Sequence, residues 1–234
     1  MSEEAAWEGK RICLLLPFYR DVHPLTAFSL LALFDRTKMA AILNYGDAFI
    51  INTRNRLASK FLATGIEWAV TVDSDMVLPC GDAKWFNSSM GFGLPDKFSG
   101  RHTINRLLSH GKTLVGALYM GRAEDGKPVY AEGYADESES ALVKAKGAQE
   151  LLKPTRWVGT GCLLIHRSVF LDIEKKFPNT ARDSKTGVGK WFTPDSDTMT
   201  KGEDVLFCMR AQASGHQPYV DLGLRCGHAG NKIF

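Results

Sequence analysis

The sequence of 234 residues lacks any apolar run that approaches the length of a membrane span, and the longest one near its start is Ile12–Leu16. Its first ten residues, MSEEAAWEGK, contain three glutamates and no basic segment, unlike a secretory signal. We therefore expect a flexible N-terminus over residues 1–10, no membrane partner and a cytoplasmic location.

Cysteine pairing of the usual kinds is also missing. The five cysteines include no C-x-x-C pair and their number is odd. Cys13, Cys162 and Cys208 lie inside apolar runs. Buried reduced thiols in a cytosolic protein explain this pattern better than disulfides do.

The glycine-rich loops that bind phosphate are absent as well. No G-x-G-x-x-G follows the first apolar run, 11–18, which argues against a dinucleotide-binding fold. Gly111-Lys112-Thr113 resembles the end of a P-loop, but Arg106 stands where the first glycine of that loop would be.

What is present is the composition of an ordinary soluble domain. Hydrophobic residues make up 44% and charged residues 24% of a chain whose length fits one domain. The net charge of +3 permits an anionic partner without requiring one.

The most informative stretch is Trp68–Pro79, WAVTVDSDMVLP. Its β-branched run predicts a buried strand, and Asp73-Ser74-Asp75 follows directly. Ligands bind at the carboxyl ends of strands in open α/β sheets, and two carboxylates close together there favour a hard divalent cation. The stretch therefore predicts a Mg²⁺ or Mn²⁺ site that receives a phosphorylated ligand. A second D-x-D, Asp195-Ser196-Asp197, lies in a polar stretch typical of a solvated turn.

Alternating strands and helices predict an α/β fold with a mixed, mostly parallel sheet flanked by helices. Expected strands cover 11–18, 39–43, 69–72, 114–120, 156–166 and 218–222; expected helices cover 24–36, 52–63, 101–110, 168–177 and 203–214. Residues 123–154 are expected to form a variable insertion. Residues 178–202 are expected to form a lid loop, because the aromatic pair Trp191-Phe192 needs a packing partner. A disordered insertion is the alternative.

Five further residues are candidates for chemistry. Arg54, near the start of a helix, could bind an anion or could simply be solvated. The glycines around Thr160, including Gly161, indicate a bulge or a close approach of backbone to a ligand. Glu203 and Asp204 open a helix, where acids are favoured by the helix dipole in any case. His228 lies between small residues, which makes it accessible as a ligand, although isolated histidines are more often structural.

Taken in order, these motifs resemble those of GT-A-type glycosyltransferases. The ordered set is TRN at 53–55, DSDM at 73–76, VGTGCLLI at 158–165, GEDVLFC at 202–208 and GHAG at 227–230. It is most similar to the compact members of glycosyltransferase family two, including bacteriophage-encoded ones, and would make residues 1–234 a single domain.

The resemblance implies a role for each position. Asp75 and His228 would bind Mn²⁺ or Mg²⁺, and Asp73, Ser74, Arg54 and Gly161 would bind the nucleotide-sugar donor. Asp204, with Glu203 beside it, would be the base for the acceptor hydroxyl in an inverting reaction. Trp191 and Phe192 would cover the site on the acceptor side.

The implied activity is the transfer of a hexose from a nucleotide sugar to an acceptor hydroxyl, and a UDP-sugar is the donor expected first. The acceptor expected first is a hydroxymethylated pyrimidine such as 5-hydroxymethylcytosine in double-stranded phage DNA, in the host cytoplasm. Arg101, Arg106, Lys112, Lys185 and Lys190 would be the candidate DNA contacts. Polysaccharide or protein acceptors, a nucleotidyltransferase, and a non-catalytic nucleic-acid or sugar-binding module are the alternatives.

Overall fold

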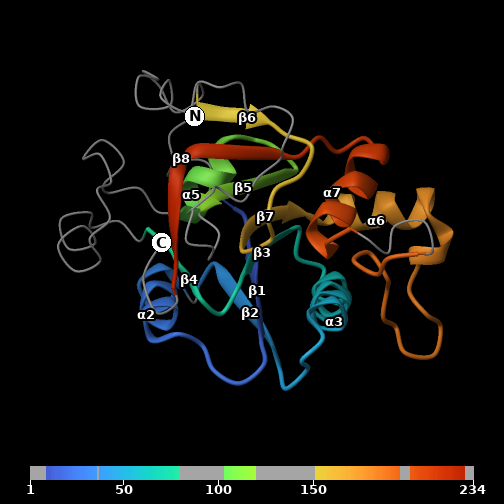
Figure 1. Cartoon of the computed structure of the whole chain (residues 1–234), viewed down its shortest axis with the longest axis horizontal. Helices are drawn as coiled ribbons and strands as arrows, with labels where there is room; N and C mark the ends of the chain where they lie inside the picture. Colours follow the sequence, from blue (N-terminus) through green and yellow to red (C-terminus); the bar gives the residue numbers. More distant parts are fainter. Residues whose placement is uncertain (1–8, 36, 80–102, 120–150, 196–200, 230–234) are drawn as a thin grey trace.

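A mixed eight-stranded sheet forms the centre of the protein, seen in Figure 1. The structure is a computed structural model that describes residues 9–35, 37–79, 103–119, 151–195 and 201–229. The strands are β1 (Ile12–Phe18), β2 (Met39–Tyr45), β3 (Trp68–Val72), β4 (Met76–Val77), β5 (Leu114–Tyr119), β6 (Leu152–Pro154), β7 (Cys162–His166) and β8 (Tyr219–His228). They follow the order β2-β1-β3-β7-β5-β8-β4, and β6 pairs with β8.

The pairing divides the sheet into two parts. β1 is parallel to β2 and β3, and β5 is parallel to β8. β7 lies between the two parts and is antiparallel to β3 and β5; the β4–β8 and β6–β8 pairs are also antiparallel. The sheet is therefore mixed, as expected, although its antiparallel share is larger than the expected mostly parallel sheet would have.

Helices cover both faces of the sheet. They are α2 (Pro24–Leu33), α3 (Ile50–Ala63), α5 (Thr103–Ser109), α6 (Arg167–Lys176) and α7 (Glu203–Ala213), with a 3₁₀ turn at Pro178–Thr180. Side chains alternate along each strand, so β1 sends Cys13 and Leu15 to one core cluster and Leu14 and Leu16 to the other. The first cluster packs against α3, α6 and α7, and the second against α2 and α5.

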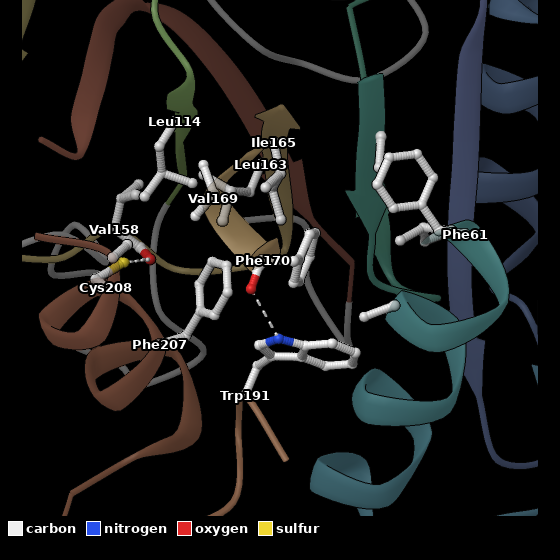
Figure 2. Close-up of a cluster of buried hydrophobic side chains, with 14 of the residues drawn as sticks. Phe61, Leu114, Val158, Leu163, Ile165, Val169, Phe170, Trp191, Phe207 and Cys208 are labelled. Atoms are coloured by element: carbon white, nitrogen blue, oxygen red, sulfur yellow. Dashed lines mark hydrogen bonds between the residues drawn. The ribbon is translucent and has the colours of Figure 1, made fainter. Parts of the chain in front are cut away.

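Aromatic side chains fill the first cluster, shown in Figure 2. Trp191 is fully buried and its indole Nε1 donates a hydrogen bond to the Phe170 carbonyl oxygen at 3.1 Å. The Phe192 and Phe207 rings stack at 4.5 Å. This packing locks α6 and α7 to the face of the sheet that also carries α3.

Most expected elements are confirmed within a few residues. The exceptions are at the end of the chain and at 156–166, where only Cys162–His166 is a strand. β8 continues past the expected strand 218–222 to His228, and its last two residues, Gly227 and His228, pair with β4. Of the helices in the described ranges, none is both long and apolar enough to cross a membrane.

Candidate functional site

The D-x-D motif lies where β3 ends, and a buried arginine on α3 holds its first aspartate. Arg54, which is only 6% exposed, donates from Nη1 and Nη2 to the two carboxylate oxygens of Asp73 at 3.0 and 3.1 Å. Its Nε lies 3.5 Å from Glu203 Oε1. Arg54 thus fixes Asp73 in a bidentate pair and joins it to the start of α7. Burial lowers the pKa of Arg54, but Asp73 and Glu203 outweigh that effect and raise it overall, so the guanidinium stays charged.

The second aspartate lies beside the late histidine. Asp75 precedes β4, and His228 ends β8 directly opposite Met76. The Ala229 amide donates to the Asp75 carbonyl oxygen at 2.7 Å, and His228 Nε2 lies 3.4 Å from Asp75 Oδ2. Strand pairing therefore brings together two residues that are far apart in the sequence. The shared metal site that the resemblance implied for them stays a prediction.

Gly161 packs against the same strand end through its backbone. Its carbonyl oxygen accepts a hydrogen bond from the Asp73 amide at 3.0 Å. A Cβ at position 161 would lie 2.9 Å from Tyr119 Cζ and 3.1 Å from Met76 Sδ. The glycine therefore serves a close approach of Tyr119. The expected donor contact at Gly161 stays a prediction.

Two acids open α7 with different surroundings. Glu203 pairs with Arg54, whereas Asp204 Oδ1 accepts a hydrogen bond from the Val205 amide at 2.7 Å. Burial and the negative charge of Glu203 raise the pKa of Asp204 above its ordinary value, although the Val205 amide and Arg54 oppose this. A carboxylate with a raised pKa binds a proton more strongly, which suits a general base.

An open cleft of about 230 Å³ adjoins the motif. Its floor is made by the ends of β1 and β3 and the start of α3. Asp47 lines the cleft and makes two contacts: Oδ1 accepts a hydrogen bond from the Phe49 amide at 2.9 Å, and Oδ2 forms an ion pair with Arg56 at 3.1 Å. The lining residues are Pro17, Phe18, Tyr19, Asp47, Ala48, Ile50, Thr53, Arg54, Asp73, Ser74 and Asp75.

The metal assignment can be tested against the donor set. In the described ranges, no group of three or more His, Cys, Asp or Glu side chains is arranged to hold a metal ion. Asp75 and His228 nevertheless offer an oxygen and a nitrogen 3.4 Å apart. Two ligands about 2.1 Å from one cation lie about 3 Å apart when they are at right angles. Mg²⁺ and Mn²⁺ commonly take one or two protein ligands and complete their shell with phosphates and water, so this pair fits such an ion.

The aromatic pair does not form a lid. Trp191 and Phe192 are 0% and 1% exposed and belong to the core cluster. Asn55 on α3 fixes the segment by accepting from the Phe192 amide at 3.1 Å and donating to Thr193 Oγ1 at 2.8 Å. The expected acceptor or lid role of this pair is wrong, because burial in the core leaves neither ring available to a ligand. Residues 196–200 of the expected lid lie outside the described residues.

One expected DNA contact is also wrong. Arg106, 1% exposed, donates to both carboxylate oxygens of the buried Asp221 at 2.6 and 2.8 Å. His110 Nε2 lies 2.7 Å from the same carboxylate. Burial alone would raise the pKa of Asp221, but His110 and Arg106 outweigh it and lower that pKa. Arg106 therefore holds α5 to β8 and cannot reach a nucleic acid.

Lys112, Lys185 and Lys190 are the other expected basic contacts among the described residues. The Lys112 ammonium lies over the Tyr219 ring at 4.7 Å. Lys185 and Lys190 are exposed on the segment that follows the 3₁₀ turn. Three expected features lie outside the described residues: Arg101, residues 1–8 of the expected flexible N-terminus and residues 123–150 of the expected insertion.

Two site residues carried no expectation. Tyr119 ends β5 and is 6% exposed; at the end of an apolar run it resembles any core aromatic. Burial, with Asp73 adding to it, raises the pKa of Tyr119, so the phenol stays neutral. Asp47 follows β2 as Asp73 follows β3, and that shared position at a strand end was the signal that could have identified it.

The architecture defined by these elements is a single α/β domain compatible with a GT-A-like fold. Among solved structures the chain is similar to A197 from STIV, with a TM-score of 0.55 and 14% identity, over 94% of this chain and 86% of that chain. At this identity the similarity concerns the fold alone. No protein-family model matches the sequence, and no curated protein matches it.

Proposed function

We propose that the protein is a metal-dependent glycosyltransferase that moves a hexose from a nucleotide sugar, best a UDP-sugar, to an acceptor hydroxyl. The observation that carries the proposal is the pairing of Arg54 with both Asp73 and Glu203. Through that pairing, the start of α7, with Asp204, lies next to the end of β3, which Asp73 and Asp75 follow, and Asp75 lies beside His228. A cation ligand pair and a candidate base thus belong to one site.

The charges at this site favour a bound cation. Asp73, Asp75, Glu203 and Asp204 contribute four carboxylates, and Arg54 is the guanidinium placed among them. A divalent cation relieves such an excess of negative charge and at the same time attracts a diphosphate. Asp75 and His228 would hold it, and the bound cation would supply positive charge to the departing nucleoside diphosphate.

The cleft beside the motif supports a nucleotide as the ligand. Tyr19 and Phe18 offer ring surface, and Asp47 offers a hydrogen-bond acceptor in the same cleft. Arg20, whose guanidinium lies 5.3 Å from the Tyr19 ring, adds positive charge near the cleft. A base could bind against the rings while its diphosphate reaches the aspartates.

The chain's own residues then account for the transfer. The acceptor hydroxyl attacks the anomeric carbon, the bond from that carbon to the diphosphate oxygen breaks, and a new carbon–oxygen bond forms. Asp204 takes the proton that the hydroxyl loses. A single displacement of this kind inverts the configuration of the anomeric carbon. We propose 5-hydroxymethylcytosine in DNA as the first acceptor to test and the cytoplasm as the site of the reaction.

The test is a donor screen. The protein with Mn²⁺ is mixed with a panel of nucleotide sugars and with unmodified or 5-hydroxymethylcytosine-containing DNA, and both the released nucleoside diphosphate and the DNA mass are measured. A sugar-sized mass gain on the modified DNA supports the full proposal, and nucleotide release without it removes DNA as the acceptor.

Two variants sharpen this screen. Asp204→Asn should slow transfer by orders of magnitude, whereas the same change at Asp35, an aspartate whose side chain is 43% exposed, should leave it unchanged. Release of pyrophosphate from a nucleoside triphosphate would instead identify a nucleotidyltransferase. Nucleotide binding that survives both chelation and Asp204→Asn, without turnover, would identify a binding module.

A further inference from the structure

Tyr119 lies between the two halves of the candidate site. It is the last residue of β5, is 6% exposed and pairs with Cys226 of β8, two residues before His228. β7, which follows Gly161, lies on the other side of β5. The side chain is therefore placed to contact both the strand end that carries Asp73 and the strand end that carries His228.

The hydroxyl contacts the Asp73 side. Gly161 donates its amide hydrogen to Tyr119 Oη at 3.2 Å, and the Gly161 carbonyl oxygen accepts from the Asp73 amide at 3.0 Å. The space that a Cβ at position 161 would occupy is filled by Tyr119 and Met76. The contacts of Gly161 with the Tyr119 hydroxyl and the Asp73 amide thus fix the position of the D-x-D backbone relative to β7.

The ring contacts the histidine side. The Tyr119 and His228 rings meet edge to face, with centroids 5.8 Å apart and an interplanar angle of 86°. On its other side, His228 Nε2 lies 3.4 Å from Asp75 Oδ2. A ring packed at right angles in this way restricts the rotation of the imidazole and keeps Nε2 directed at Asp75.

We propose that Tyr119 is a positioning residue of the cation site: its ring sets the orientation of His228, and its hydroxyl sets the Gly161–Asp73 backbone contact. The inference rests on the proposed function, because it concerns how Asp75 and His228 present one O and one N to a divalent ion. Partners that orient metal ligands in this way typically contribute about 10- to 100-fold to metal affinity.

Two substitutions separate the two parts of the side chain. Tyr119→Leu removes the ring and the hydroxyl, whereas Tyr119→Phe removes the hydroxyl alone. Tyr219→Leu is the matched control. Tyr219 is a partly buried tyrosine on a strand and packs against the same core cluster as Tyr119, but it lies at the other end of β8 from His228. Mn²⁺ affinity is measured by electron paramagnetic resonance with UDP present, UDP affinity is measured without metal, and amide exchange at Gly161 and Asp73 is followed by NMR.

The expected results differ among the variants. Tyr119→Leu should weaken Mn²⁺ binding by about tenfold or more, with metal-free UDP affinity unchanged. Tyr119→Phe should keep Mn²⁺ affinity within about threefold, since the ring remains, but should speed exchange at the Gly161 and Asp73 amides. Tyr219→Leu should change none of these quantities.

The outcomes also separate this inference from the proposed function. If the wild-type protein binds Mn²⁺ and Tyr119→Leu binds it equally well, or if both leucine variants lose affinity equally, the positioning role is overturned while the proposed function stands. If the wild-type protein binds no Mn²⁺, both fall together. Should Tyr119→Leu fail to fold, unchanged amide exchange in Tyr119→Phe overturns the inference and faster exchange supports it.

Discussion

Removal of the Arg54 guanidinium should destabilise the protein far more than removal of its neighbour Arg56. Arg54 is 6% exposed and binds Asp73 through two hydrogen bonds, with Glu203 at 3.5 Å, whereas Arg56 is 52% exposed and pairs with Asp47. Both residues lie on the same helix within three positions. They therefore form an internally matched comparison of a buried and a solvated arginine.

The magnitudes follow from burial. Loss of one partner of a buried ion pair costs about 3–5 kcal/mol, because it leaves an uncompensated charge. The Asp73 and Glu203 side chains are 28% and 23% exposed, so water can reach both. We therefore expect the lower end, about 3 kcal/mol, for Arg54→Met. Arg54→Lys should cost about 1–2 kcal/mol, since an ammonium cannot match the bidentate fork. Arg56→Met should cost at most about 1 kcal/mol.

Urea unfolding at pH 7 measures these differences, and for a domain of this size about 3 kcal/mol corresponds to about 6–12 °C in melting temperature. A double-mutant cycle with Asp73→Asn isolates the pair: the double variant should be less destabilised than the sum of the single variants. Equal losses from Arg54→Met and Arg56→Met, or a loss below about 1 kcal/mol for Arg54→Met, would refute the reasoning.

Four further substitutions have outcomes that follow from the same structure. Asp204→Asn should lower kcat by about 10²- to 10⁴-fold with donor affinity preserved, and the acid limb of the wild-type pH–rate profile should lie above the range of a free aspartate; loss of donor binding would contradict the base role. Because the folded-state pKa of Asp204 is raised, its charge costs stability above that pKa, so the Asn variant should be more stable at pH 7 and lose this advantage as the pH falls through the raised pKa. Asp221→Asn should lower the free energy of unfolding by about 3–5 kcal/mol at neutral pH. Because the folded-state pKa of Asp221 is lowered, its charge stabilises the fold at a pH above the unfolded-state pKa. The stability difference between wild type and variant, measured by urea titration, should therefore disappear as the pH falls through the lowered pKa. Trp191→Ala should lower the free energy of unfolding by about 3–5 kcal/mol, whereas a true lid residue would lose activity at constant stability. Gly161→Ala should cost about 1–3 kcal/mol by overpacking, and wild-type-like calorimetric stability would show that Tyr119 can move aside.

Local pattern was sufficient to predict most of the fold and part of the site. Asp73 and Asp75 were identifiable because an apolar β-branched run ends at two carboxylates, and a strand end is a place that depends on nearby sequence alone. Arg54 was identifiable as a candidate from its place on a helix. Its actual partner, Asp73, became evident only once α3 was packed on the sheet.

The errors share one physical cause, which is that burial is decided by contacts between distant segments. Trp191 and Phe192 stand in a polar stretch, and only Asn55 and the helices of the core explain why they are inside. Arg106 was predicted to be a surface cation, because its partner Asp221 is 115 residues away in the sequence. Tyr119 resembles an ordinary core residue, because nothing near it in the sequence indicates that its ring lies against His228.

The short pairing of β4 with β8 has a consequence for how the protein responds to its ligand. Only two register pairs join these strands at the end of the sheet, and one of them is Met76 with His228. Such a terminal pair is the kind of structure that opens locally without global unfolding. A cation held by Asp75 and His228 would link the two strands, so that separation of β4 from β8 and release of the ion would be one equilibrium. Metal concentration would then set how often the end of the sheet opens, which amide exchange along 225–228 would report directly.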